Sequence, residues 1–88
     1  MSLEFPNSSR SYDATRRAVR FWGHDRAMEW SFFVTQDGLK HVEPAMAQDE
    51  SGMLGAFDSN RERICAAAVR AYSRARKGSY ELGPAELS

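Results

Sequence analysis

The sequence is short of the features that mark several familiar classes of protein. It has a single cysteine, Cys65, which excludes an intramolecular disulfide and a cysteine-rich zinc site. No apolar stretch approaches the ~18–20 residues that a membrane-spanning helix requires. Residues 1–6 carry neither the basic nor the apolar segment of a secretory signal peptide. We therefore expect a cytoplasmic protein that is not embedded in a membrane.

An excess of charge of one sign is also missing. Twelve basic residues balance twelve acidic ones, and the isoelectric point is about 6.7. This balance argues against a nucleic-acid coat or a polybasic membrane anchor. Apolar residues make up 42% of the chain, which is typical of a folded globular protein rather than a disordered one. The 88 residues suffice for one domain, in which we expect residues 1–11 to form an extended arm anchored by Phe5.

Two alternating runs predict an antiparallel β-hairpin. In the first run, Val19 and Phe21 share one side of a strand, with the period of two that one covered face requires. In the second run, residues 28, 30, 32 and 34 share one side, while residues 29, 31 and 33 share the other. The polar residues 23–27 form the loop between them, where Gly23 is available for a positive φ.

Two helices are predicted after the hairpin. Thr35 can cap a short helix, Asp37 favours its first turn, and Pro44 ends it. A long helix is predicted next, from about Asp49–Gly52 to Lys77, because apolar residues recur at helical spacing in one stripe. Gly78 is expected to close this helix as the first residue beyond it. The stripe consists of Met53, Leu54, Phe57, Ile64, Ala68, Ala71, Tyr72 and Ala75.

The C-terminal segment 80–82 alternates and favours a short strand. Pro84 bars a long continuation, so this strand is expected at the edge of the sheet. The predicted element order is β-β-α-α-β. This order indicates an α+β domain in which the hairpin and the edge strand form an antiparallel sheet, packed on one face against one short and one long helix.

Some of these positions also carry a resemblance to a known family. They are Tyr12-Asp13, Val19-x-Phe21, Trp30-x-Phe32-x-Val34-Thr35 with Leu39, and Phe57-x-x-x-Arg61-x-x-Ile64-x-x-x-Ala68. In this spacing, over about residues 5–87, the chain resembles the small bacterial proteins catalogued as domain of unknown function 1488. The resemblance implies a compact α+β domain and no assigned activity, cofactor or substrate. Some members carry a cysteine where this chain has Phe32, so a cysteine-based role there does not apply to it.

Arg61 is a charged residue inside the predicted apolar stripe, between Phe57 and Ile64. A buried guanidinium group needs a partner, and two interpretations are open. In one, the stem of Arg61 covers the core and its head pairs with Asp13, Glu29 or a backbone carbonyl. In the other, Arg61 binds an anion in a pocket. The first interpretation is the commoner role of such a residue.

A basic ridge is the second candidate site. Arg63, Arg70, Arg74 and Lys77 are predicted on the side of the long helix opposite the apolar stripe, over roughly 21 Å. Such a surface either binds a polyanion, such as a nucleic-acid backbone, or is a solvated helix face. No aromatic pair or helix-turn-helix motif accompanies it, so the solvated face is the simpler interpretation.

Catalytic and metal-binding constellations are missing from the sequence. His24-Asp25 and His41-x-Glu43 are the only candidate acid–base or metal groups, and their spacing supplies no third strong ligand. Cys65 has no visible catalytic partner and is expected to behave as a small apolar residue. Neither a glycine-rich phosphate loop nor a nucleophile elbow occurs. We therefore expect a protein that is not an enzyme and that holds neither a metal nor a cofactor.

The last candidate is the side of the hairpin turned away from the predicted core. Trp22 and Phe33 are expected to form an apolar area there that is large for a small monomer. We expect the arm to cover it through Phe5 and Tyr12; the alternative is a second copy of the chain or another protein. The leading functional hypothesis is an interaction module that contacts itself or a protein partner. The second is weak binding of nucleic acid or another polyanion along the basic ridge.

Overall fold

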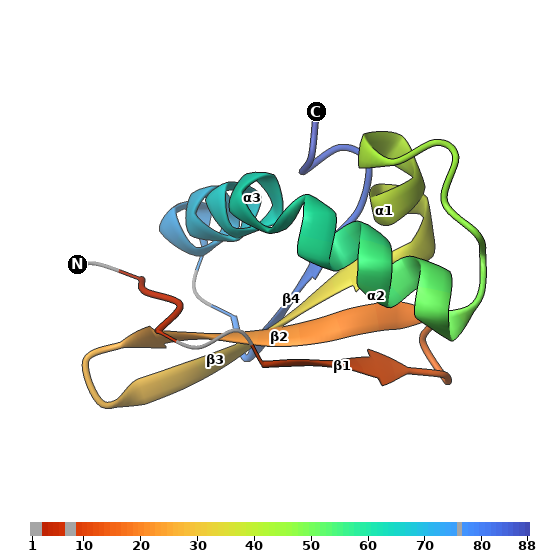
Figure 1. Cartoon of the computed structure of the whole chain (residues 1–88). Helices are drawn as coiled ribbons and strands as arrows, with labels where there is room; N and C mark the ends of the chain where they lie inside the picture. Colours follow the sequence, from red (N-terminus) through yellow and green to blue (C-terminus); the bar gives the residue numbers. More distant parts are fainter. Residues whose placement is uncertain (1–2, 7–8, 76) are drawn as a thin grey trace.

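The computed structural model describes residues 3–6, 9–75 and 77–88. Its elements follow in the order β1 (Arg10–Asp13), β2 (Ala18–Asp25), β3 (Met28–Thr35), α1 (Gln36–Val42), α2 (Glu50–Ser59), α3 (Arg61–Arg74) and β4 (Ser79–Leu82). The fold is α+β, as predicted, with one strand and one helix more than the sequence predicted. The strands form one sheet in the order β1-β2-β3-β4, and α1, α2 and α3 lie on the same side of it (Figure 1).

The predicted hairpin is confirmed as the centre of the sheet. β2 and β3 pair antiparallel, so that Val19 lies opposite Val34 and Phe21 lies opposite Phe32. All four side chains are fully buried beneath the helices. The alternation in the sequence therefore identified the correct inner side of both strands.

Gly23 has a different role from the predicted one. It lies inside β2, and none of the described glycines has a positive φ. A Cβ at this position would lie 2.9 Å from side-chain carbons of both Leu3 and Phe5. The glycine therefore leaves the space in which the N-terminal arm packs. The hairpin turn itself is Arg26-Ala27, with a φ of 60° at Arg26.

The N-terminal arm packs on the helix side of the sheet. The backbone of Glu4 exchanges two 2.8 Å hydrogen bonds with that of His24. The Phe5 ring lies 5.7 Å from the ring of Phe21 and 6.0 Å from that of Phe32, centroid to centroid. Because these rings belong to the core, Phe5 anchors the arm as predicted, but to the inner side. The predicted positions 1, 2, 7 and 8 of the arm lie outside the described residues.

The end of the predicted arm is a strand. Residues 10–13 form β1, in which Tyr12 lies opposite Val19 and packs against the core. The prediction that Phe5 and Tyr12 cover the other side of the sheet is therefore wrong. The side of β1 follows from its register with β2, which the short polar sequence 10–13 does not reveal.

The predicted short helix is confirmed as α1. Thr35 is its N-cap, and the Thr35 hydroxyl accepts a 3.0 Å hydrogen bond from the backbone N–H of Gly38. Glycine costs helix propensity at this position, but a Cβ on residue 38 would lie 2.7 Å from the carbonyl oxygen of Leu82. Gly38 therefore allows α1 to approach the end of β4 closely.

The predicted long helix is two helices, α2 and α3, separated at Asn60. Asn60 has a φ of −119° and a ψ of 23°, which are not helical values. Its side-chain amide donates to Glu43 Oε1 at 3.0 Å and to the carbonyl oxygen of Ala56 at 2.9 Å. The side chain of Asn60 thus bonds a carbonyl oxygen near the end of α2, and this competition for a backbone acceptor explains the break.

The apolar stripe continues across this break and therefore conceals it. Met53 and Phe57 of α2 are fully buried, and Ile64, Ala68 and Tyr72 of α3 are 0–2% exposed. Three further members of the predicted stripe are less buried. Leu54 and Ala71 are half-buried, and Ala75 is exposed and lies beyond α3.

α3 ends at Arg74, earlier than predicted, so Gly78 does not close it. Ala75 is extended, with a φ of −155°. The hydroxyl of Tyr80 donates to the carbonyl oxygen of Ala75 at 2.7 Å and accepts from the N–H of Lys77 at 3.0 Å. Tyr80 therefore satisfies backbone groups next to the helix end, in place of a glycine cap.

β4 lies at the edge of the sheet, as predicted, but it pairs parallel with β3. The sheet is therefore mixed rather than antiparallel. The helices between the two strands return the chain to the end of the sheet from which β3 starts, as a parallel pairing requires. After β4, a C-terminal turn buries Leu87 in the core. No helix in the described part of the chain is long and apolar enough to cross a membrane.

Candidate functional site

The side of the sheet that faces away from the helices carries the candidate site. We call it the outer face; its central residues are Arg20, Trp22, Phe33 and Glu81. The strand register places Arg20, Phe33 and Glu81 in one row across β2, β3 and β4. Trp22 lies one row away on β2. Among the elements that the structure describes, no helix covers this face (Figure 1).

Two guanidinium groups cover the ring of Phe33. The Cζ atom of Arg16 lies 4.2 Å from the ring centroid, and that of Arg20 lies 5.7 Å from it. Arg20 also lies 5.0 Å from the ring of Trp22 and donates a 2.9 Å hydrogen bond to Ser31 Oγ. Phe33 is consequently only 6% exposed, and its cover comes from these arginines, not from the arm as the sequence had predicted. Arg16, Arg20, Trp22 and Phe33 form a cation–π cluster.

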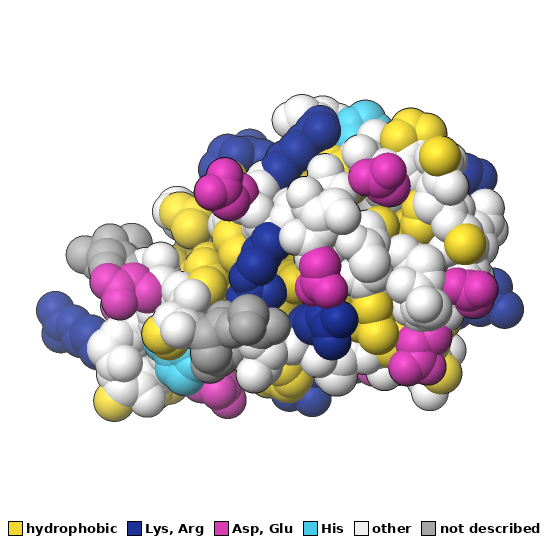
Figure 2. Space-filling view, viewed as in Figure 1, with side chains coloured by type: hydrophobic (Ala, Val, Ile, Leu, Met, Phe, Trp, Pro, Cys, Tyr) yellow, Lys and Arg dark blue, Asp and Glu magenta, His cyan; other side chains and the backbone are white. Residues whose placement is uncertain are grey.

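Charges of both signs surround this cluster. Asp13 accepts a 3.0 Å hydrogen bond from the backbone N–H of Arg16 and lies 3.6 Å from Arg16 Nε. His24 Nε2 lies 3.5 Å from Glu29 Oε2 at the other end of the outer face. Acidic and basic side chains are also interspersed over the side of the molecule that Figure 2 shows. The outer face is therefore a mixed surface rather than a purely basic one.

The predicted basic ridge is partly used within the fold. Arg63 donates to the carbonyl oxygen of Leu87 at 3.1 Å, and Arg70 donates to that of Glu86 at 3.0 Å. These two arginines hold the C-terminal turn against α3. Lys77 lies beyond the end of α3, so the four predicted residues do not share one helix.

The other two ridge residues lie beside acidic groups. Arg74 and Lys77 line a pocket of about 270 Å³ together with Glu81 and Glu86. The carboxylates offset the positive charge that a polyanion requires. The ridge is therefore not a continuous basic surface.

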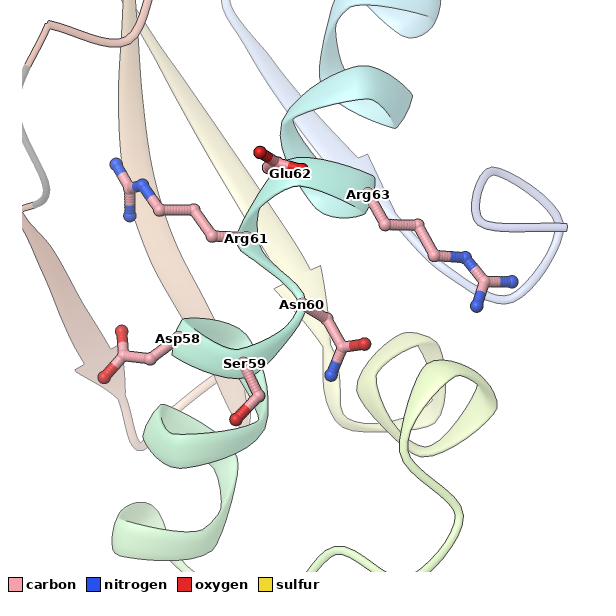
Figure 3. A pocket seen from close by; sticks show the side chains of 6 residues that line it. All are labelled: Asp58, Ser59, Asn60, Arg61, Glu62 and Arg63. Carbon is pink, nitrogen blue, oxygen red and sulfur yellow. The ribbon is translucent and has the colours of Figure 1, made fainter.

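Arg61 lies beside a pocket of about 350 Å³ at the junction of α2 and α3. It is half-buried rather than buried, and its Cζ atom lies 5.2 Å from the centroid of the Phe57 ring. Figure 3 shows that Arg61 and Arg63 extend to opposite sides of the junction. Asp58, also in the lining, is held by Arg10 at 2.8 and 3.0 Å, which raises the pKa of Arg10. The charged groups of this pocket do not converge on one point.

The predicted acid–base candidates have separate roles. Asp25 Oδ2 accepts a 2.5 Å hydrogen bond from the hydroxyl of Tyr72. Glu43 accepts the amide of Asn60, and His41 is exposed on α1. Within the described residues, no three side chains of His, Cys, Asp or Glu gather in a group that could hold a metal ion.

Cys65 is half-buried on α3 and packs against the core. Burial raises the pKa of its thiol, and the nearby charge of Arg61 acts in the opposite direction. A raised thiol pKa lowers the fraction of reactive thiolate at neutral pH. The environment of Cys65 is thus that of a packing residue.

A comparison with known protein families shows to which family this chain is related. The sequence pattern of the family described as protein of unknown function DUF1488 matches residues 3–82. The chain belongs to the DUF1488 family. The resemblance inferred from the core residues is therefore confirmed. No curated protein matches the chain.

A solved DUF1488 structure has the same fold. It is the crystal structure of a protein of unknown function from Shewanella loihica PV-4, which is 18% identical in sequence. The match covers 92% of this chain and 91% of that chain, with a TM-score of 0.81. At this identity the likeness shows the fold of this DUF1488 protein and nothing about its function.

Sequence reasoning missed two residues of the outer face. Arg16 lies in the turn between β1 and β2, where an alternating pattern assigns no side. Glu81 alternates with the buried residues Tyr80 and Leu82, which does place it on the outer side of β4. Its position beside Phe33 depends on the parallel register of β3 and β4, for which the sequence has no signal.

Proposed function

We propose that this DUF1488 protein is a non-enzymatic interaction module, and that it binds a second copy of itself through the outer face of its sheet. The observation that carries this proposal is the cation–π cluster on a sheet face that no described helix covers. Arginine and tryptophan are the residue types most enriched at binding hot spots. The rings hold the guanidinium groups in place before a partner arrives, which reduces the entropy lost on binding.

The mixed charge of the outer face favours a protein partner over a polyanion. Asp13, Glu29 and Glu81 lie among the arginines and would repel a phosphate backbone. The ring of Phe33 is covered by Arg16 and Arg20, so it offers no open surface on which a base can stack. Two residues of the basic ridge are also engaged by the C-terminal turn. Polyanion binding is therefore the weaker candidate.

The charge of the whole chain favours a second copy as the partner. The formal net charge is zero, so two copies do not repel each other at long range. The outer face carries both guanidinium and carboxylate groups, so it can be complementary to itself, as an isologous interface requires. A protein of strong net charge of either sign would gain no comparable match from this surface.

The size of the outer face predicts a weak dimer. Two strands of eight residues and two of four, at ~3.3 Å per residue and ~4.8 Å apart, offer roughly 380 Å² per copy. Stable complexes commonly bury about 800 Å² per partner. The dimer is therefore expected to dissociate on dilution.

Light scattering over a range of protein concentrations tests this function. The wild-type mass should rise toward twice the monomer mass with concentration, and high salt should change this only modestly. Trp22→Ser should abolish the rise. Met28→Ser is the matched control, because Met28 is 57% exposed but lies in the inner-side register of the hairpin end. A wild type that stays monomeric, or a W22S protein that still dimerises, contradicts the proposal.

A pool of mixed oligonucleotides tests the second candidate in the same instrument. Binding to a polyanion should appear at low salt, disappear steeply as salt rises, and depend on Arg63, Arg70, Arg74 and Lys77. Replacing all four by glutamine separates the two functions. If these replacements abolish an oligonucleotide-dependent gain in mass and W22S changes nothing, the basic ridge is the functional surface.

A further inference from the structure

Arg20 and Glu81 flank Phe33 on neighbouring strands, in one row across the sheet. Adjacent strands are ~4.8 Å apart, so the backbone positions of the cation and the anion lie equally far from β3, on opposite sides. A two-fold axis parallel to β3 and above Phe33 exchanges these two sides. When two outer faces stack around this axis, Arg20 of one copy lies opposite Glu81 of the other.

We propose that Arg20 and Glu81 determine the specificity of the self-association, each Arg20 pairing with the partner's Glu81. This inference rests on the function proposed above and specifies the register of the two copies. The two-fold symmetry forms the pair twice. The two ion pairs therefore favour a second copy of this chain over a protein that offers only an apolar contact.

Both groups are prepared for this pairing. The guanidinium of Arg20 is held by Ser31 Oγ at 2.9 Å and by the rings of Trp22 and Phe33. Glu81 is exposed; it lines a pocket with Arg74 and Lys77 but forms no ion pair with either of them or with any other described residue. Association therefore breaks no existing ion pair of Glu81, and it costs little conformational entropy at Arg20.

Arg16 opposes the pairing. Its guanidinium lies over Phe33, close to the proposed axis, so the two copies of Arg16 approach each other. Asp13, which is 3.6 Å from Arg16 Nε, offsets only part of this charge. Arg16→Gln is therefore expected to strengthen the dimer several-fold. Loss of a charge elsewhere on the surface would not have this effect.

Two charge reversals test the pair. Arg20→Glu lowers the net charge from 0 to −2, and Glu81→Arg raises it from 0 to +2. Each variant alone places like charges opposite each other twice, and its dimer should be at least ~10-fold weaker. A 1:1 mixture of R20E and E81R restores opposite charges at both positions. The mixture should form a heterodimer with an affinity near that of the wild type, measured by sedimentation equilibrium.

Lys40→Glu and Glu50→Arg are the matched controls. They give the same net charges of −2 and +2, but both residues are exposed on α1 and α2, on the other side of the sheet. Each control should dimerise like the wild type, and their mixture should gain nothing. A gain in the control mixture equal to that of R20E and E81R would mean attraction by net charge, and would overturn the inference.

The remaining outcomes separate the inference from the proposed function. If R20E and E81R each weaken the dimer but their mixture stays monomeric, the register is wrong while the outer face remains the interface. If neither variant changes the affinity of the dimer and W22S still abolishes association, the Arg20–Glu81 pair does not determine specificity and the inference is wrong. If the wild type never associates, both proposals fail. Should R20E not fold, the order wild type, Glu81→Gln, Glu81→Arg must run from strong to weak, and an equal affinity of all three contradicts the pair.

Discussion

The two faces of the sheet carry aromatic rings on the same strands, but different groups cover those rings. On the inner face, Phe21 lies 5.0 Å from Phe57 of α2 and 5.7 Å from Phe5 of the arm. On the outer face, Phe33 lies beneath the guanidinium groups of two arginines. Apolar cover from the chain itself leaves nothing for a partner to bind, whereas a charged cover can still form ion pairs and hydrogen bonds.

This contrast separates stability from recognition. Fully burying an aromatic or aliphatic side chain contributes about 1.5–3 kcal/mol to folding, and the inner face buries most of the large apolar residues. An exposed cation–π contact contributes only about 0.5–1 kcal/mol. Substitutions on the inner face should therefore act on the free energy of unfolding, and those on the outer face on association.

The largest expected effect is that of Phe57→Ala. Phe57 is fully buried and contacts Phe21, so the substitution should lower the free energy of unfolding by about 3–5 kcal/mol. Trp22→Ala on the outer face should lower it by less than about 1 kcal/mol. Urea unfolding followed by circular dichroism measures both. A Trp22 variant as unstable as the Phe57 variant would break the division of roles between the faces.

Gly38→Ala tests the packing of the inner face where α1 approaches the end of β4. Its Cβ would lie 2.7 Å from the Leu82 carbonyl oxygen, so α1 must move and stability should fall by about 1–3 kcal/mol. Gly55→Ala is the control, because a Cβ there meets nothing within 4 Å in α2 and alanine favours the helix. It should raise stability by about 0.5–1 kcal/mol. Thermal unfolding that moves both variants in the same direction would refute the close approach of α1 to β4.

Tyr72→Phe tests the link between α3 and the hairpin. It removes the 2.5 Å hydrogen bond to Asp25 Oδ2 and should cost about 1–2 kcal/mol. Tyr12→Phe is the control, since the hydroxyl of Tyr12 bonds no other described residue, and its cost should be close to zero. Equal unfolding midpoints for the two variants would show that the bond to Asp25 adds nothing.

The smallest expected effect concerns Cys65 and pH. Burial raises the pKa of this thiol in the folded protein, so the unfolded chain ionises first as pH rises. The free energy of unfolding should therefore fall slightly above about pH 8, as the pH passes the ordinary pKa of a thiol. Cys65→Ala should remove this part of the decline and leave the profile below pH 7 parallel to that of the wild type. Profiles that stay parallel up to pH 10 would contradict a raised thiol pKa.

Local patterns were sufficient to predict much of the inner face. The alternation around Val19 and Phe21 placed both on the buried side, and Thr35 marked the start of α1. The helix break was missed because the stripe of apolar residues continues in phase past Asn60. The direction of β4 was missed because alternation identifies a strand but does not orient it.

The outer face was less predictable because its contacts join distant parts of the chain. Alternation placed Trp22 and Phe33 on one side of the hairpin. The cover of Phe33 depends on Arg16, which reaches it from a turn, and the flanking Glu81 depends on the register of β4. The arm was assigned to the wrong face because the space above Gly23, where Phe5 packs, exists only in the folded chain.

Intermolecular nuclear Overhauser effects give the most direct test of the outer face as the binding surface. They are measured in a 1:1 mixture of isotope-labelled and unlabelled protein, at a concentration where light scattering reports dimers. We expect cross-peaks between copies from Trp22, Arg20 and Glu81. Cross-peaks confined to the helices, or none at all from the sheet, would contradict this expectation.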